Sequence, residues 1–308
     1  MMPAIATLHA HLLGALSPAP TETRRVFHGR GRCWPGLEQI TVDWLQGVLL
    51  VSLFREPPEG QLAALEQMLR NLAASPAWPG QAVLIQHRYL PESPGQWLLG
   101  EPCEQRVIDE DGLRYQLDLG LKQNTGLFLD MRYGRRWVRE QAAGKRVLNL
   151  FAYTCGFSVA AIAGGAEQVV NLDMARSALS RGRDNHRLNG HDLGRVGFLG
   201  HELFKSWGKV RKGGPYDLII IDPPTFQKGS FVLTQDYSKI LRRLPELLSE
   251  GGTVLACVND PAIGPDFLIE GMAADAPDLV FVERLANPPE FPDSDPVGGL
   301  KALVFRQG

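Results

Sequence analysis

The chain has 308 residues, of which 44% are hydrophobic and 21% charged, and these proportions exclude a disordered or fibrous protein. The formal net charge is −2 and the isoelectric point is near 6.4, so the overall electrostatic field does not indicate a nucleic-acid partner. The length exceeds one minimal core and predicts a catalytic domain with a smaller companion.

Two local basic patches are the candidates for contact with RNA. One lies near the N-terminus and the other lies just before the second half of the chain. Their members are Arg24, Arg25, His28, Arg30 and Arg32, and Lys122, Arg132, Arg135, Arg136 and Arg139. For each patch, a solvated arginine-rich surface without a partner is the alternative interpretation.

Cysteine spacing and hydropathy indicate the compartment. The four cysteines are scattered and form no CxxC pair, so we expect no disulfide framework and no metal site, and a reducing cytoplasm. No apolar run reaches the length of about 18 residues that a membrane span needs. Residues 4–16 have helical apolar spacing but include His9 and His11, which predicts an amphipathic helix and no signal peptide.

The first 120 residues are predicted to form that helix followed by a small α+β module. Apolar alternation predicts paired strands over residues 39–44 and 47–54, and apolar spacing predicts a helix over residues 60–73. Further strands are predicted over residues 82–89, 96–99 and 113–119, between turns that contain proline and glycine.

From residue 144 the pattern changes, because short continuous apolar runs alternate with helical stretches. The runs cover residues 147–151, 169–172, 196–199, 218–221, 253–258, 279–282 and 302–305. The helices are predicted over residues 157–163, 174–188, 234–249 and 265–274. Continuous apolarity indicates strands buried on both faces. Residues 121–308 are therefore expected to form a doubly wound α/β domain of Rossmann-like type, with seven mostly parallel strands and an irregular C-terminal pair.

Polar residues fall at the ends of the apolar runs. Asn149 lies within the first, Asp173, Asp222 and Asn259 end the second, fourth and fifth, and Glu202 follows the third. The carboxyl ends of parallel strands form the ligand crevice of an open sheet, so these five groups should converge.

Residues 149–157 read as a tight strand-to-helix turn that brings backbone N–H groups toward a ligand, although the sequence is not GxGxxG. A purely structural turn is the alternative interpretation of this stretch. Asp173 ends the next strand, where a carboxylate can accept both ribose hydroxyls of an adenosine cofactor. A helix cap at Asp173 is the structural alternative. Glu202 is a candidate acceptor for the adenine amine, with a solvated loop acid as the alternative.

Residues 222–226 read Asp-Pro-Pro-Thr-Phe after an Ile-rich strand. Prolines remove backbone donors, so carbonyl groups and Asp222 can face a ligand that donates hydrogen bonds, while Phe226 offers a stacking surface. A planar base that has left its helix suits this arrangement. A structural Pro-Pro turn would explain Pro223 and Pro224 but not the acid and the aromatic ring beside them.

These motifs together resemble the bacterial 23S ribosomal RNA methyltransferases that join a small α+β module to a class I domain. The resemblance covers residues 115–305, and its markers are residues 124–132 (NTGLFLDMR), residues 147–154 (VLNLFAYT), Asp173 and DPPTF. It implies S-adenosylmethionine as cofactor and ribosomal RNA as partner, with residues 1–120 as a module that could recognise RNA. The implied cofactor residues are Phe128, Asp130, Arg132, Asn149, Phe151, Tyr153, Thr154, Gly156, Phe157, Asp173, Met174, Glu202 and Asp222.

Two branches of this group differ after the fifth strand. The cytosine-C5 branch has a catalytic cysteine in a Ser-Cys-Ser element, whereas this chain has Asn259 at that position and Cys257 two residues earlier. Strand alternation predicts that Cys257 is a buried structural residue. The guanine-N7 branch is more similar, because it shares DPPTF, the asparagine, and a helix like residues 174–190 that opens with Asp-Met and closes with Arg-Leu-Asn-Gly.

We therefore expect methylation of guanine N7 in ribosomal RNA, with Asp222, Pro223, Phe226 and Asn259 as the catalytic set. N7 has a free lone pair, so alignment with the methyl group would supply most of the catalysis. Asp222 would hold the N1–H and amino edge of guanine, and Phe226 would stack on the ring.

The chain departs from the family pattern at Cys155, where glycine is usual, and at His201-Glu202, where the usual pair ends in aspartate. Cys155 is expected either to crowd the methionine tail of the cofactor or to require an unusual backbone angle. Three alternatives stay open: cytosine-C5 methylation through Cys257, a cofactor- or RNA-binding protein without catalysis, and methylation of a small molecule.

Overall fold

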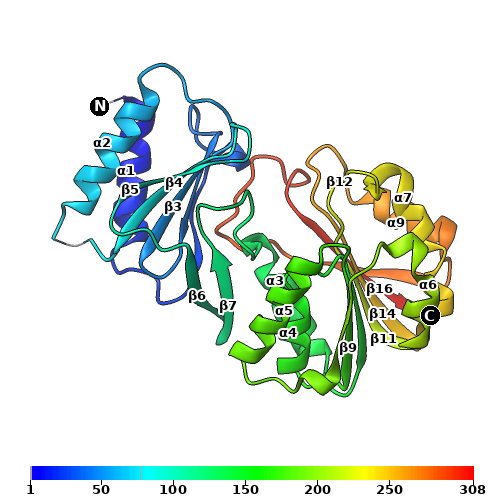
Figure 1. Cartoon of the computed structure of the whole chain (residues 1–308). Coiled ribbons are helices and arrows are strands. Elements are labelled where there is room, and N and C mark those ends of the chain that lie inside the picture. The colour runs from blue at the N-terminus through cyan, green and yellow to red at the C-terminus, as the bar shows by residue number, and fades with distance from the viewer. Residues whose placement is uncertain (1, 77) are drawn as a thin grey trace. The chain divides into compact units, whose positions relative to one another are not determined.

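The computed structural model describes residues 2–76 and 78–308 and divides into two compact units (Figure 1). Unit 1 extends to Leu129 and also includes Pro289–Pro296, and unit 2 contains Asp130–Pro288 and Val297–Gly308. The sequence predicts a domain boundary after residue 120. In the structure the boundary lies after Leu129. No feature of the sequence predicts that Pro289–Pro296 also belong to unit 1.

Unit 1 is built on a five-stranded sheet in the order β1-β2-β3-β4-β5. The strands are β1 Arg24–His28, β2 Ile40–Trp44, β3 Val48–Leu53, β4 Ala82–His87 and β5 Gly95–Leu99. Neighbours are antiparallel except β3 and β4, which are parallel. The helix α2 Gln61–Ala73 makes that crossover, and α1 Pro3–Ala15 lies beside it (Figure 1). Buried leucines of both helices share one core with the sheet.

The remaining elements of unit 1 are short. The 3-10 turn η1 Gly29–Gly31 follows β1, and β6 Gln105–Glu110 and β7 Leu113–Asp118 form a separate antiparallel hairpin. The predicted pairing of residues 39–44 with 47–54 is confirmed by β2 and β3. The apolar pattern does not predict β1, because its two arginines and its histidine surround the apolar pair Val26 and Phe27.

Unit 2 is a seven-stranded sheet in the order β10-β9-β8-β11-β14-β16-β15, and every predicted apolar run is one of its strands. Their bounds are β8 Arg146–Leu150, β9 Gln168–Leu172, β10 Val196–Leu199, β11 Tyr216–Ile221, β14 Leu248–Val258, β15 Leu279–Arg284 and β16 Lys301–Gln307. The first five strands in this order are parallel, and β16 is antiparallel to both of its neighbours. The predicted doubly wound α/β fold is confirmed.

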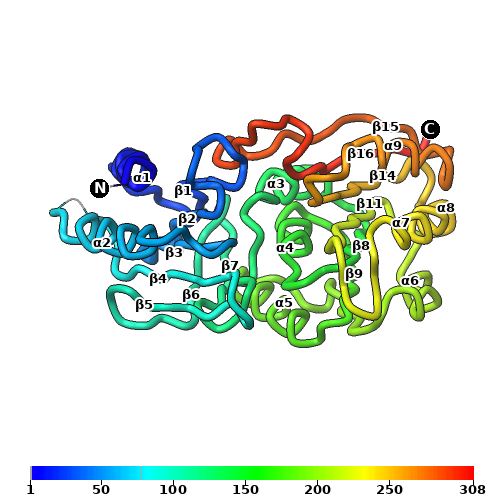
Figure 2. The backbone as a smooth tube through the Cα atoms, turned by 90° about the horizontal axis from the view of Figure 1, so that it is seen from above, coloured from blue at the N-terminus to red at the C-terminus, as the bar shows by residue number. Residues whose placement is uncertain are grey.

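Helices cover both faces of this sheet (Figure 1). One layer contains α3 Arg132–Gln141, α4 Gly156–Ala163 and α5 Arg176–Leu188. The other contains α6 Trp207–Lys212, α7 Leu233–Leu241, α8 Leu244–Leu247 and α9 Asp266–Asp275 (Figure 2). Successive residues of each central strand enter opposite cores: Val147 joins the first layer and Leu148 the second. Burial on both faces explains why these runs are continuously apolar.

The predicted helix over residues 234–249 is wrong in its second half. The helix α7 ends at Leu241, the short α8 ends at Leu247, and Leu248 already begins β14. Pro245 stands in the first turn of α8, where its missing N–H has no cost. Helix α3 is likewise not predicted by the apolar pattern, because its few apolar residues are scattered among arginines. Short elements complete the unit: η2 Leu129–Met131, η3 Leu193–Arg195, η4 Leu203–Lys205, β12 Phe226–Gln227 and β13 Phe231–Val232.

Within residues 2–76 and 78–308, no helix is both long enough and apolar enough to cross a membrane. The same residues contain no group of three or more histidine, cysteine, aspartate or glutamate side chains that could hold a metal ion. All four cysteines are free thiols, and two of them, Cys155 and Cys257, are buried.

Candidate active site

The carboxyl ends of the parallel strands of unit 2 bring the predicted polar residues to one edge of the sheet. Asp173 directly follows β9, Asp222 follows β11 and Asn259 follows β14, while Asn149 is the penultimate residue of β8. The register pairs Asn149 with Asn171 of β9 and with Ile220 of β11. The order of strands therefore sets the order of these side chains along the edge.

The loop that connects β8 to α4 has an unusual backbone. Phe151, Tyr153 and Cys155 have φ angles of 57°, 48° and 64°, so three residues other than glycine take the left-handed conformation. Each costs about 1 kcal/mol or more, so the surrounding structure must stabilise the loop.

Two neighbouring elements provide that stabilisation. Tyr153 N donates to Asp173 Oδ2 at 2.8 Å, and Ala152 N donates to Leu172 O at 3.0 Å, which ties the loop to β9. Asn185 Nδ2 of α5 donates to Thr154 O at 3.0 Å, and Asn185 is fully buried. The loop is therefore held in place by β9 and α5 before any ligand binds.

Cys155 is one of the two places at which the chain departs from the family pattern. Its predicted unusual backbone angle is present, but its side chain is fully buried and packs with Leu179 of α5. The helix accommodates the sulfur at Gly182, where an added Cβ would lie 2.3 Å from Cys155 Sγ. Packing against α5 accounts for the thiol, so the expected crowding of a cofactor does not follow from it.

Asp173 links the loop to the start of α5. Its Oδ2 accepts from Tyr153 N and its Oδ1 accepts from Ala175 N, both at 2.8 Å. Burial raises the pKa of Asp173, and these two backbone hydrogen bonds oppose that shift. A carboxylate has about four acceptor positions. The capping role and a contact with two ribose hydroxyls are therefore compatible.

Beneath the loop lies a buried chain of polar side chains that the sequence analysis did not identify, apart from Asn149. Asn149 Nδ2 donates to Asn171 Oδ1, and Asn171 Nδ2 donates to Ser158 Oγ, both at 2.9 Å. Ser158 Oγ lies 2.9 Å from His186 Nε2, and burial lowers the pKa of His186 to about 3. Asn149 Oδ1 is buried and has no hydrogen-bond partner among the described residues. One acceptor below the loop is thus left for a ligand.

A second group of side chains lies around the end of β11. Burial of the carboxyl group and the nearby charge of Asp130 raise the pKa of Asp222 to about 7, and the charge of Arg135 opposes this shift. Asn259 Nδ2 donates to Asp130 Oδ2 at 3.4 Å. The structure therefore brings together Asp130, Asp222 and Asn259, which come from three separate parts of the sequence.

Cys257 lies two residues before Asn259 and is fully buried, as predicted. Burial and the carboxylates of Asp222 and Asp130 raise the pKa of its thiol well above the usual value. The thiolate is the reactive form of cysteine, so this environment does not favour Cys257 as a nucleophile. Tyr237 Oη donates to the carbonyl oxygens of Cys257 and Ile221 at 3.2 and 3.3 Å, which joins the ends of β14 and β11.

The remaining predicted residues differ in exposure. Phe226 is 64% exposed at the start of the β12–β13 hairpin, and Phe128 and Met174 are also exposed. Of the other remaining residues, Arg132, Thr154, Phe157 and Pro223 are buried and Phe151 is partly buried. Gly156 is the first residue of α4.

Glu202 follows β10, and its carboxylate already has a structural role. Its Oε1 accepts from Phe204 N at 2.8 Å, which caps η4, and Lys205 Nζ lies 3.8 Å from its Oε2. These contacts leave further acceptor positions on the carboxylate.

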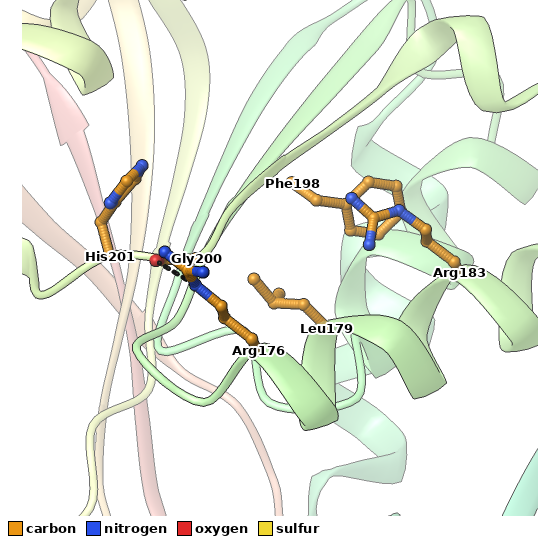
Figure 3. Close-up of a pocket in the computed structure, with 6 residues that line it drawn as sticks. All are labelled: Arg176, Leu179, Arg183, Phe198, Gly200 and His201. Atoms are coloured by element: carbon orange, nitrogen blue, oxygen red, sulfur yellow. Dashed lines mark hydrogen bonds between the residues drawn. The ribbon is translucent and has the colours of Figure 1, made fainter.

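A cavity of about 220 Å³ lies beside this edge, between α5 and β10 (Figure 3). Its lining consists of Arg176, Leu179, Arg183, Phe198, Gly200 and His201. Arg176 Nε donates to Gly200 O at 3.4 Å, and the Arg183 guanidinium carbon lies 4.4 Å from the centre of the Phe198 ring. Pockets for whole ligands measure about 300–1,000 Å³, so this cavity can hold only part of one.

Comparison with known proteins matches residues 24–306 to the family described as S-adenosylmethionine-dependent methyltransferase. The ribosomal RNA large subunit methyltransferase I of Aeromonas salmonicida is 32% identical over 285 residues, which cover 88% of this chain and 72% of that protein. A putative SAM-dependent methyltransferase from Streptococcus mutans has a solved structure that is 26% identical, with a TM-score of 0.86 over 98% of this chain and 80% of that one.

The structure of SMU.776, a putative methyltransferase complexed with SAH, is 25% identical, with a TM-score of 0.85 over 98% of this chain and 80% of that one.

Proposed function

Because this chain belongs to the S-adenosylmethionine-dependent methyltransferase family, we propose that it methylates a base of large-subunit ribosomal RNA. The observation that carries the proposal is the edge of the unit 2 sheet, where the strained loop, Asp173 and Asp222 follow β8, β9 and β11. The loop and Asp173 suit a nucleoside cofactor, and the acid and exposed aromatic ring of residues 222–226 suit a planar base.

S-adenosylmethionine supplies a methyl group on a positively charged sulfur. In the proposed site, Asp173 accepts hydrogen bonds from the ribose hydroxyls while it keeps its bonds to Tyr153 N and Ala175 N. Glu202 lies at the end of the neighbouring strand β10, where its free acceptor positions suit the adenine amine. Asn149 Oδ1 offers a further buried acceptor.

The base is proposed to lie against Phe226, with its donor edge on Asp222. Guanine presents N1–H and an amino group, and a carboxylate can accept from both. The lone pair of N7 then forms the bond to the methyl carbon as the bond from carbon to sulfur breaks. This transfer needs neither a thiolate nor a base, which agrees with the buried, protonated state expected for Cys257. The names of the relatives do not support N7 over other atoms, so this specificity depends on the site alone.

Cytosine C5 is the second candidate, because Cys257 is near Asp222 and Asp130 at the end of β14. That chemistry needs a thiolate to add to C6 of the ring before C5 can attack the methyl group. The two mechanisms separate in the Cys257→Ala variant. N7 methylation should retain at least half of the wild-type rate, whereas C5 methylation through Cys257 should be lost.

Mass-spectrometric nucleoside analysis of large-subunit ribosomal RNA from a deletion strain tests the proposal. We expect one 7-methylguanosine to disappear, to return with the wild-type gene and to stay absent with Asp222→Ala. Loss of 5-methylcytidine would support the second candidate. An unchanged set of nucleosides in ribosomal RNA would contradict both.

A further inference from the structure

Unit 1 collects cationic and aromatic side chains at one edge of its own sheet. The strands β1, β3 and β4 run in the same direction, since β1 and β3 are both antiparallel to β2 and β4 is parallel to β3. The residues that follow their carboxyl ends therefore lie at the same edge. Arg30 lies in η1 after β1, Phe54 follows β3 and Arg88 follows β4.

These three side chains are in contact. The guanidinium carbon of Arg30 lies 4.2 Å from the centre of the Phe54 ring, and that of Arg88 lies 4.7 Å from the same point. Arg88 Nη2 donates to Asn124 Oδ1 at 3.3 Å. The segment that carries Asn124 is held at this edge by Gln86 Nε2, which donates to Lys122 O at 2.6 Å.

Three neighbouring arginines are paired with carboxylates, and Arg88 is not. The paired ones are Arg25 with Asp43, Arg24 with Glu290 and Arg32 with Asp293. Among the described residues Arg88 makes no ion pair, and its buried Nε has no hydrogen-bond partner. Burial and the charges of Arg30 and Arg25 lower the pKa of Arg88, and the charge of Asp43, which forms no ion pair with Arg88, opposes this shift.

An incompletely bonded guanidinium next to a second arginine is suited to an anion with several acceptor oxygens. Guanidinium groups bind phosphate through two parallel N–H···O bonds, and the apolar ring of Phe54 limits the access of water on one side. We propose that Arg30 and Arg88, beside Phe54, bind a phosphodiester group of the RNA substrate. This inference rests on the proposed function, because it takes RNA as the partner of unit 1.

The clustered arginines also have an electrostatic cost to stability, which a cluster that served only packing would not have. Positive charges gathered at one edge repel each other, and Asp43, whose charge partly offsets this repulsion at Arg88, forms its ion pair with Arg25. Removal of Arg88 should therefore leave the stability of the protein unchanged or raise it, while it weakens RNA binding. A packing role predicts the opposite, a loss of stability without a specific loss of binding.

The test measures binding of a fluorescently labelled 23S rRNA transcript by the whole chain at several NaCl concentrations. Arg88→Gln is compared with Arg70→Gln, which removes an equal charge from α2, where Arg70 Nη1 contacts Leu98 O. We expect Arg88→Gln to weaken binding about tenfold and to reduce the slope of log K against log salt by about 1. Arg88→Lys, which keeps the charge but loses the fork, should fall between wild type and Arg88→Gln.

Two controls separate this site from the proposed function. In Arg88→Gln, the affinity for S-adenosylhomocysteine should be unchanged and the melting temperature should not fall. If the wild type methylates ribosomal RNA and Arg88→Gln binds RNA as tightly as Arg70→Gln, the phosphate site is refuted and the proposed function stands. If the wild type binds the transcript through Arg88 but no ribosomal nucleoside changes in the deletion strain, the phosphate site stands and the proposed function fails.

Discussion

The contact between Cys155 and Gly182 can be tested by a double-mutant cycle. In Gly182→Ala, the new Cβ would lie 2.3 Å from Cys155 Sγ and 2.9 Å from Cys155 Cβ, so the loop or α5 must move. Overpacking of this kind costs about 1–3 kcal/mol. An alanine in place of a helical glycine would by itself stabilise by about 0.5–1 kcal/mol. The single variant should therefore lose up to about 2.5 kcal/mol of unfolding free energy.

Cys155→Gly removes the clashing atoms and places glycine at a φ of 64°, a conformation that glycine adopts freely. In that background Gly182→Ala should stabilise the protein, so the coupling energy of the pair should be about 1–3 kcal/mol. The assay is urea unfolding of the four proteins, with S-adenosylhomocysteine affinity as a second readout. We expect Gly182→Ala to weaken cofactor binding and the double variant to restore it. Additive effects within about 0.5 kcal/mol would refute the proposed packing of the loop on α5.

Three further predictions concern titratable groups. Asp222→Ala should lower kcat/KM about 100-fold, because two hydrogen bonds to a charged group are lost, while S-adenosylhomocysteine affinity stays within threefold of wild type. The pKa of Asp222 is raised to about 7 and the ionised form is the acceptor, so kcat/KM should fall as the pH drops below about 7. Asp130→Asn should move the midpoint of this pH profile to lower pH. A midpoint that does not move would exclude Asp130 as a cause of the raised pKa. The pKa of His186 in the folded protein is about 3, below its value in the unfolded chain. The unfolding free energy should therefore fall as the pH drops from about 6.5 toward 3, by up to about 1.4 kcal/mol per pH unit. The urea midpoint should depend less steeply on pH in His186→Gln than in the wild type, and an equal dependence would contradict this prediction.

Much of unit 2 could be predicted because its strands are buried on both faces. A run such as residues 218–221 has no polar residue to confuse its assignment, and its end marks where Asp222 must lie. The predictions failed where burial is partial or unusual. In α3, Arg132 and Arg135 are themselves buried, so the helix has no recognisable apolar stripe.

The candidate site could be predicted only as far as the strand ends. Asp173 and Asp222 were found because they directly follow apolar runs. Gly182, Asn185 and His186 were missed because they act on the loop and its support across space, from the middle of a polar helix. Their sequence offers one signal, which is that a glycine and an asparagine within a helix are uncommon without a packing or bonding role.

The most direct test of the cofactor site is calorimetric titration of the whole chain with S-adenosylhomocysteine. Asp173→Ala is compared with Asp184→Ala, which removes an acid that pairs with Arg187 on the exposed face of α5. Loss of even one charge-assisted hydrogen bond, about 1.5–3 kcal/mol, weakens binding at least about tenfold. We expect that loss in Asp173→Ala and wild-type affinity in Asp184→Ala. A folded Asp173→Ala variant with the wild-type dissociation constant would contradict the proposal that this edge of the sheet holds the cofactor.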